Sequence, residues 1–156
     1  MKVCIYGAGA IGGWIGAHLA QHGCSLSAVA RGATLEALQQ NGLVLLQSDQ
    51  EIHASLLARE NPADLGVQDL VIVAVKAPAM ADVARRIGPL IGPNTVVLTA
   101  MNGVPWWFLQ GFGGALSGTT LQSVDPSGVI AQHIPADRVI GGVVHASCSV
   151  DMPGVI

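Results

Sequence analysis

Six residues near the N-terminus have the types and the spacing needed to bind a diphosphate. They form the run Gly7-Ala8-Gly9-Ala10-Ile11-Gly12, which lies between a short β-rich segment and a segment with helical spacing. Glycine allows a tight turn at the first position, close approach of the backbone to a pyrophosphate at the second, and close helix-to-strand packing at the third. The amides that begin the helix would face the phosphates. The pattern predicts a dinucleotide site, with an ordinary glycine-rich turn as the alternative.

The end of the second predicted strand distinguishes between two dinucleotides. Sites that prefer NAD place Asp or Glu here to bond the ribose 2′-hydroxyl, whereas an arginine suits the 2′-phosphate of NADP. This chain has Arg31 at that point, and no carboxylate follows before Glu36. A guanidinium group can bind a phosphate through two parallel hydrogen bonds. Arg31 therefore favours NADP, with a surface arginine that binds nothing as the alternative.

Two polar residues directly follow two further predicted strands. Lys76 comes after the apolar run 70–75, and Asn102 comes shortly after the run 95–99. In an open α/β sheet the ligand crevice lies at the carboxyl ends of the strands. A lysine there can bind a phosphate, a carbonyl or a carboxylate, and an asparagine can orient an amide or a hydroxyl. Together they indicate a reactive site, whereas each alone could be an exposed lysine or a turn residue.

Strands and helices alternate along the chain in the way that positions these residues. The pattern predicts strands at 2–6, 25–30, 70–75, 95–99 and 139–150, helices at 10–22, 34–40 and 78–91, and a hairpin that pairs 43–46 with 52–57. The run 70–75 is apolar on both faces, as expected for a central strand covered by helices. The predicted fold is a Rossmann-like α/β domain: a doubly wound, mostly parallel sheet with helices on both faces.

The last third of the sequence departs from this alternation. Residues 106–135 are rich in Gly, Ser, Asp and Pro, and predict a long loop with a short helix at 129–133. His145 lies in the apolar run 139–150, where a core histidine is expected. The chain stops after a turn signal at 151–154, at the start of another predicted strand. We therefore expect residues 1–156 to form one dinucleotide-binding domain and the chain to be truncated.

Composition excludes several classes of protein. The chain has 156 residues, 51% of them hydrophobic, and a formal net charge of −3 with only 7 Lys plus Arg. No basic stripe suits a nucleic acid, and no apolar run is long enough to span a membrane. The three cysteines are unpaired in spacing, which favours reduced thiols in the cytoplasm. His18 and His22 are four residues apart, but no third ligand joins them, so no metal is expected.

In combination, these residues resemble the N-terminal part of the ketopantoate reductase (2-dehydropantoate 2-reductase) family. The matching pieces occur in the family's order: Gly-Ala-Gly-Ala-Ile-Gly at 7–12, Arg31, Val-Lys-Ala at 75–77, Asn-Gly-Val at 102–104, and Gly-Val-Val-His-Ala-Ser at 142–147. Singly they are not specific, whereas together they are.

The resemblance implies an NADPH-dependent reduction of a 2-keto acid, 2-dehydropantoate to pantoate, in pantothenate biosynthesis. Residues 7–12 and Arg31 would hold the diphosphate and the 2′-phosphate. Lys76 and Asn102 would flank the nicotinamide, Asn102 would also reach the substrate, and Ser147 would add a cofactor contact. In the family the general-acid lysine and a substrate-binding carboxylate come from a second, helical domain. This chain alone is therefore expected to bind NADP(H) without turnover, and the full-length protein could form a homodimer.

Two alternatives remain open at this point. The segment 106–135 is longer than the short helix-turn common in the family, and paralogues act on other keto acids. The chain could be the cofactor domain of another NADP-dependent dehydrogenase of the hydroxyacid or opine type, which the sequence of its second domain would reveal. It could also be a non-catalytic dinucleotide-sensing module, which tends to carry an acidic residue in place of Arg31 and needs no Lys76/Asn102 pair.

Overall fold

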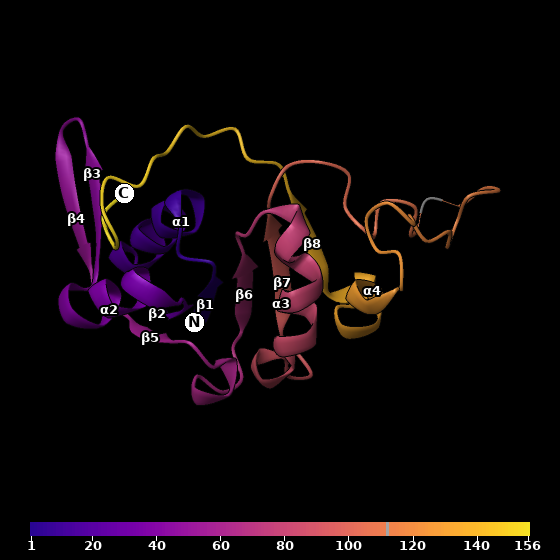
Figure 1. Cartoon of the computed structure of the whole chain (residues 1–156), viewed down its shortest axis with the longest axis horizontal. Helices are drawn as coiled ribbons and strands as arrows, with labels where there is room; N and C mark the ends of the chain where they lie inside the picture. Colours follow the sequence, from indigo (N-terminus) through magenta and orange to yellow (C-terminus); the bar gives the residue numbers. More distant parts are fainter. Residues whose placement is uncertain (112) are drawn as a thin grey trace.

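A six-stranded parallel sheet forms the centre of the computed structural model, which describes residues 1–111 and 113–156. The strands lie in the order β5-β2-β1-β6-β7-β8 (Figure 1). Their bounds are β1 (Lys2–Tyr6), β2 (Ser25–Val29), β5 (Leu57–Arg59), β6 (Leu70–Val73), β7 (Val96–Ala100) and β8 (Val139–Gly142). The predicted Rossmann-like sheet is confirmed, and every pair of neighbours in it is parallel.

The direction of chain progress through the sheet reverses at β1. This strand pairs with β2 on one side and with β6 on the other, so that Cys4 lies opposite both Ser27 and Val71. The chain runs outward through β2 and β5, then returns to β6 and continues outward through β7 and β8. A crevice opens at the carboxyl ends of the strands at such a switch point. The topology alone therefore places a ligand site above β1 and β6.

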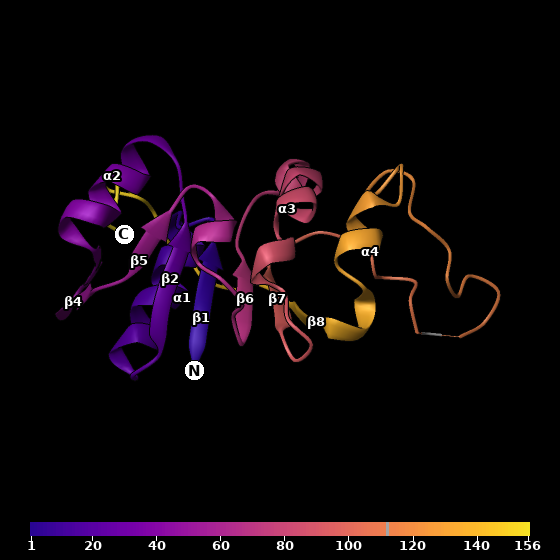
Figure 2. The same cartoon turned by 90° about the horizontal axis from the view of Figure 1, so that it is seen from below.

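Helices cover both faces of the sheet, as predicted (Figure 2). The α-helices are α1 (Ala10–Gln21), α2 (Gly32–Asn41), α3 (Met80–Arg86) and α4 (Val129–His133). Alternate residues of β1 point to opposite faces. Ile5 packs in one apolar cluster with Ala17 of α1, whereas Cys4 packs in the other with Val83 of α3 and Ile130 of α4. The sheet core is thus two buried layers that share β1.

The predicted hairpin forms, but its second strand ends earlier than expected. Strands β3 (Leu43–Gln47) and β4 (Gln50–Ala54) pair antiparallel, apart from the main sheet. Leu57 belongs instead to β5, where it pairs with Ser27. The sequence of residues 52–57 does not reveal this break, because apolar residues lie on both sides of it.

The predicted helix over 78–91 is broken into three pieces. They are the 3₁₀ turn η2 (Ala77–Ala79), helix α3, and the 3₁₀ turn η3 (Gly88–Leu90). Pro89 has no amide hydrogen and cannot continue the α-helical ladder, and Gly88 favours a break before it. Two further 3₁₀ turns, η1 (Pro62–Asp64) and η4 (Ala136–Arg138), lead into β6 and β8.

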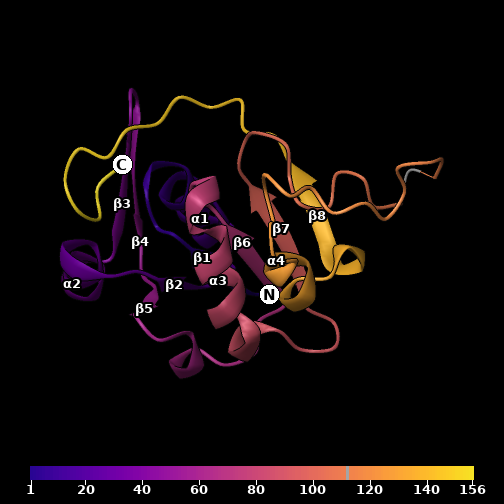
Figure 3. The ribbon, with the colours of Figure 1, turned by 45° about the vertical axis from the view of Figure 1, so that its right-hand side comes forward.

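The predicted strand over 139–150 is wrong beyond Gly142. Residues 143–150 have no regular structure, and His145 is exposed instead of lying in a core. This segment arches past α1 and brings the end of the chain to the hairpin (Figure 3). There the backbone amide of Ile156 donates to the carbonyl oxygen of Val44 at 2.9 Å. None of the helices in the described ranges is long and apolar enough to cross a membrane.

Candidate functional site

A pocket of about 350 Å³ opens at the carboxyl ends of β1, β2 and β6. Of the predicted site residues, five line it: Gly7, Ala8, Gly9, Arg31 and Lys76. The other glycine-loop residues, Ala10, Ile11 and Gly12, form the first turn of α1. The structure therefore brings together the residues predicted for the diphosphate and the 2′-phosphate with the predicted lysine.

Two of the three fingerprint glycines are required by the fold itself. Gly7 has φ +98°, and a Cβ there would lie 2.7 Å from Cγ1 of Val75 and 3.0 Å from the carbonyl oxygen of Ala74. A Cβ on Gly12 would overlap the carbonyl oxygen of Gly7. These glycines allow the turn after β1 to tighten and α1 to lie directly against it.

Gly9 has a different role from its two neighbours. It has an extended backbone (φ −84°, ψ −161°), and a Cβ added to it would meet no atom within 4 Å. Gly9 is also the N-cap of α1, and no side chain caps that helix. The amide groups of the first turn are therefore available to an anion that approaches over open backbone. This space fits the diphosphate of a dinucleotide, and the fold itself gives no reason for a glycine here.

Arg31 lies at the start of a second helix beside the same pocket. It is the N-cap of the ten-residue helix α2, and no side chain caps this helix either. The guanidinium group is exposed and makes no hydrogen bond or ion pair with any residue that the structure describes. Thr34, one turn into α2, also lines the pocket. A free guanidinium, uncapped amides and a hydroxyl group together suit a phosphate monoester.

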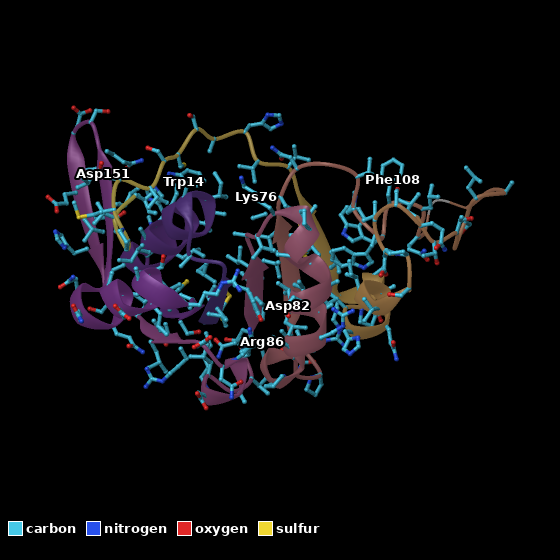
Figure 4. The ribbon with its side chains drawn as sticks, in the orientation of Figure 1. Trp14, Lys76, Asp82, Arg86, Phe108 and Asp151 are labelled. Atoms are coloured by element: carbon cyan, nitrogen blue, oxygen red, sulfur yellow. The ribbon has the colours of Figure 1, made fainter. Side chains whose placement is uncertain are left out.

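Lys76 lies at the opposite side of the crevice, where the chain leaves β6. Its extended backbone (φ −74°, ψ 147°) makes it the N-cap of η2. Figure 4 shows it between α1 and α3, below the segment that follows β8. Its ammonium group has no partner among the described residues, and the side chain is exposed. Arg31 and Lys76 are thus two unneutralised cations on the walls of one pocket.

Asn102 is engaged elsewhere in the fold. Its side-chain NH₂ donates to the carbonyl oxygen of Val144 at 3.1 Å, and its side-chain oxygen accepts from the amide of Val144 at 2.8 Å. The pair ties the end of β7 to the segment after β8, 42 residues away. One N–H and one lone pair of the amide remain for a ligand. Neither Asn102 nor the exposed Ser147 lines the 350 Å³ pocket.

The other residues that line the pocket include four with polar side chains that were not predicted to belong to the site: Tyr6, Glu60, Asp82 and Arg86. An NH₂ group of Arg86 donates to the carbonyl oxygen of Glu60 at 2.9 Å, and its other terminal nitrogen lies 4.0 Å from Oδ2 of Asp82. Asp82 and Arg86 are four residues apart on a helix, and this spacing could have indicated the pair from the sequence alone. No sequence pattern indicated Tyr6, because it continues an otherwise apolar strand.

Tyr6 is the unusual member of this group. Its side chain is buried, and its hydroxyl oxygen has no hydrogen-bond partner among the described residues. Burial raises the pKa of Tyr6 above its usual value of 10.0; the positive charge of Arg86 opposes that rise and the negative charge of Asp82 adds to it.

The two histidines that were weighed as metal ligands have other neighbours. The His18 ring packs edge-on against Trp14, with ring centroids 5.5 Å apart. Nδ1 of His22 lies 2.8 Å from the carbonyl oxygen of His18. Across residues 1–111 and 113–156, no group of three or more His, Cys, Asp or Glu side chains is arranged to hold a metal ion.

Comparison with known proteins gives a consistent result. A curated 2-dehydropantoate 2-reductase from Mesorhizobium japonicum is 50% identical over 157 residues, which cover 100% of this chain and 48% of that protein. The crystal structure of a "putative ketopantoate reductase" from Ralstonia solanacearum MolK2 is 53% identical, with a TM-score of 0.93, over 98% of this chain and 47% of that one. A 2-dehydropantoate 2-reductase from Porphyromonas gingivalis W83 matches at 26% identity and a TM-score of 0.77, over 99% of this chain and 50% of that one.

This chain therefore spans about half the length of the relatives it matches. The family model described as "Ketopantoate reductase PanE/ApbA" matches residues 3–106, which include the glycine loop, Arg31, Lys76 and Asn102. Together with 50% identity to a curated member over the whole chain, this match means that the chain belongs to the ketopantoate reductase family.

Proposed function

We propose that this chain is the cofactor-binding part of an NADPH-dependent reductase of a 2-keto acid, with 2-dehydropantoate as the substrate. The observation that carries the proposal is the free guanidinium of Arg31 at the uncapped start of α2, beside the pocket. The name of a curated relative that is 50% identical to this chain, 2-dehydropantoate 2-reductase, supports the substrate.

The residues present fit the dinucleotide in three places. The amides around Gly9 would hold the diphosphate, because they begin α1 and face open space. Arg31 and Thr34 would hold the 2′-phosphate. Lys76 places a positive charge at the carboxyl edge of β6, where it would stabilise a carboxylate or the negative charge that develops on a carbonyl oxygen. When bound, the nicotinamide ring supplies the hydride.

Reduction of a ketone to an alcohol consumes one hydride and one proton. We assign the proton donor and the remaining substrate contacts to the part of the relatives that this chain does not match. Asn102 would orient the nicotinamide or the substrate with the N–H and the lone pair that Val144 leaves free. Accordingly, the 156-residue chain should bind NADPH and reduce no 2-dehydropantoate; turnover by this chain would place the donor within it.

Cofactor preference is the direct test. Fluorescence or calorimetric titration of the chain should show tighter binding of NADPH than of NADH. Arg31→Gln should weaken NADPH binding by at least about tenfold, because it removes a charge-assisted hydrogen bond. NADH binding should stay within about twofold, since NADH has no 2′-phosphate.

The matched control is Arg85→Gln. Arg85 is an exposed arginine of α3 that does not line the pocket, and its guanidinium donates only to the carbonyl oxygen of Ala81. This variant should bind both cofactors like the wild type. Equal affinities for NADPH and NADH that Arg31→Gln leaves unchanged would contradict the proposal and favour a dinucleotide-sensing module.

A further inference from the structure

One part of the pocket has no task in the proposed function. It consists of Tyr6, Asp82 and Arg86, with the backbone of Glu60, and is called the α3 cluster here. Figure 4 shows Asp82 and Arg86 on α3, on the side of the helix toward the centre of the molecule. The amides around Gly9, together with Arg31 and Thr34, already account for the phosphate groups of an NADP molecule, so the α3 cluster needs its own explanation.

The α3 cluster presents hydrogen-bond donors and acceptors side by side. The hydrogen bond to Glu60 holds the half-buried guanidinium of Arg86 across the groove, and it uses only one of the five N–H donors. Asp82 lies 4.0 Å away and makes no hydrogen bond within the part of the chain that the structure describes. A ligand at this point would meet an oriented donor and a free acceptor.

The Tyr6 hydroxyl is a second, independent observation. The residue is 5% exposed, and the hydroxyl group, buried against the pocket, has no partner among residues 1–111 and 113–156. Buried polar groups in folded proteins are nearly always paired, and an unpaired one reduces stability. A polar ligand in the pocket would give this group, directly or through Arg86 and Asp82, the partner that the fold does not provide.

The chemistry of the α3 cluster suits a purine edge better than a phosphate. A phosphate only accepts hydrogen bonds, and the carboxylate of Asp82 would repel it. The first turn of α2, which follows Arg31, carries no acidic residue. The edge of adenine carries both an amino donor and ring-nitrogen acceptors. Val29, Val75 and Val83 line the same pocket and provide apolar walls for a flat ring.

We propose that Tyr6, Asp82 and Arg86 recognise the edge of the adenine base and make this site selective for adenine over hypoxanthine. The inference rests on the proposed function only in taking an adenine dinucleotide as the ligand. Asp82 accepts from the 6-amino group, and Arg86 donates to the neighbouring ring nitrogen. Hypoxanthine has a carbonyl group and an N–H at these two positions. Asp82 would then face an acceptor and Arg86 a donor, so neither hydrogen bond could form.

The first experiment compares bases in binding titrations. The wild-type chain should bind NADPH at least about tenfold more tightly than deamino-NADPH, which carries hypoxanthine. ADP and IDP should show the same preference without any nicotinamide. Asp82→Asn should reduce the preference to within about twofold, because a side-chain amide can donate to the carbonyl group. Equal wild-type affinity for the two bases overturns the inference, while NADPH binding that depends on Arg31 leaves the proposed function intact.

The second experiment separates base recognition from phosphate recognition. Arg86→Gln should weaken NADPH and NADH by the same factor, about tenfold, whereas Arg31→Gln changes their ratio. Arg85→Gln, one position along α3, should change neither. A selective loss of NADPH binding in Arg86→Gln would make Arg86 a phosphate ligand and overturn the inference.

Tyr6→Phe provides a readout that a structural role would not give. The variant removes only the unpartnered hydroxyl, so the melting temperature of the ligand-free chain should stay the same or rise. Binding of ADP should nevertheless weaken by about threefold or more, with less discrimination against IDP. A lower melting temperature with unchanged ADP affinity would show that the hydroxyl serves the fold, and would overturn its part in the inference.

Discussion

The first 100 residues and the 56 that follow are held together in different ways. In the first region, five neighbouring parallel strands share backbone ladders, and the two apolar layers lie against them. In the second region, β8 is the only described strand, and most of the described chain between β7 and α4 extends away from the sheet (Figure 1). The pocket is lined entirely by residues between Tyr6 and Arg86, and therefore belongs to the first region.

In the second region, hydrogen bonds from individual side chains hold the backbone in place, whereas backbone ladders between strands do so in the first. Asp125 is 1% exposed, and its two oxygens accept from the amides of Ile130 and Ala131 at 3.1 and 3.0 Å, which caps α4. The indole N–H of Trp106 donates to the carbonyl oxygen of Ile134 at 3.2 Å. The second region therefore depends on a few residues, and we expect that its local unfolding would leave the pocket unchanged. Four predictions test that difference.

The largest effect is expected at the glycine loop of the first region. Gly12→Ala should lower the free energy of unfolding by about 3 kcal/mol, because its Cβ would overlap the carbonyl oxygen of Gly7 and force α1 away from β1. Urea denaturation followed by circular dichroism measures the loss. NADPH binding should be lost as well, since the same shift moves the start of α1.

Gly9→Ala is the control for this variant, in the same loop. Its Cβ meets nothing within 4 Å and its φ of −84° suits alanine, so the free energy of unfolding should change by less than about 0.5 kcal/mol. NADPH binding should fall by at least about tenfold, because the methyl group occupies the space left for the diphosphate. Normal binding by Gly9→Ala would mean that the dinucleotide does not lie over this backbone.

Alkaline pH should also act mainly on the first region. Burial in the sheet raises the pKa of the Cys4 thiol from its usual 9.0 to about 11, against a smaller lowering by Ser27. Above about pH 9 the unfolded chain releases this proton while the folded chain keeps it, so stability falls as pH rises. The contribution should reach about 2 kcal/mol by pH 11.

Denaturation at pH 8, 9.5 and 11 measures this slope. Cys4→Ala should make it shallower, apart from a constant loss for the missing side chain. Cys148→Ala is the comparison from the second region. The Cys148 thiol is only half-buried, and this partial burial also raises its pKa. An equal flattening by both variants would show that the two thiols do not differ in environment.

The difference between the regions also explains what the sequence could predict. The runs of β1, β6 and β7 are continuous and apolar, and periodicity finds such strands without knowledge of the fold. Arg31 and Lys76 could be placed because they follow strand ends, and parallel strands bring those ends to one edge. The glycine loop could be recognised because all of its contacts lie within one βαβ unit.

The remaining features depend on contacts between residues far apart in the chain. Arg86 reaches the carbonyl oxygen of Glu60, 26 residues earlier, and Asn102 holds Val144, 42 residues later. No local pattern specifies either contact. The run 139–150 predicted a strand that ends at Gly142, because residues beyond it find no neighbouring strand with which to pair. Apolar character alone does not determine pairing.

A smaller effect is expected from the cap of α4. Asp125→Ala should lower the free energy of unfolding by about 1.5 kcal/mol, because it leaves two backbone amides near the helix start without a partner. Asp137→Ala, at an exposed position in the same region, should change it by less than about 0.5 kcal/mol. NADPH affinity should be the same for both variants as for the wild type. Weaker NADPH binding by Asp125→Ala would show that the two regions are coupled.

The smallest effect should come from Asn102, which joins the end of β7 to the segment after β8. Asn102→Ala removes both hydrogen bonds to Val144, which are exposed, and should cost about 1 kcal/mol locally. Hydrogen exchange should quicken at the Val144 amide and its neighbours, while the amides of β1 and β6 keep their protection. Because Asn102 does not line the pocket, ADP should bind as before, and only ligands that carry the nicotinamide should bind more weakly. A loss of ADP affinity would mean that the segment after β8 helps to shape the adenine end of the site, and that the boundary between the two regions lies elsewhere.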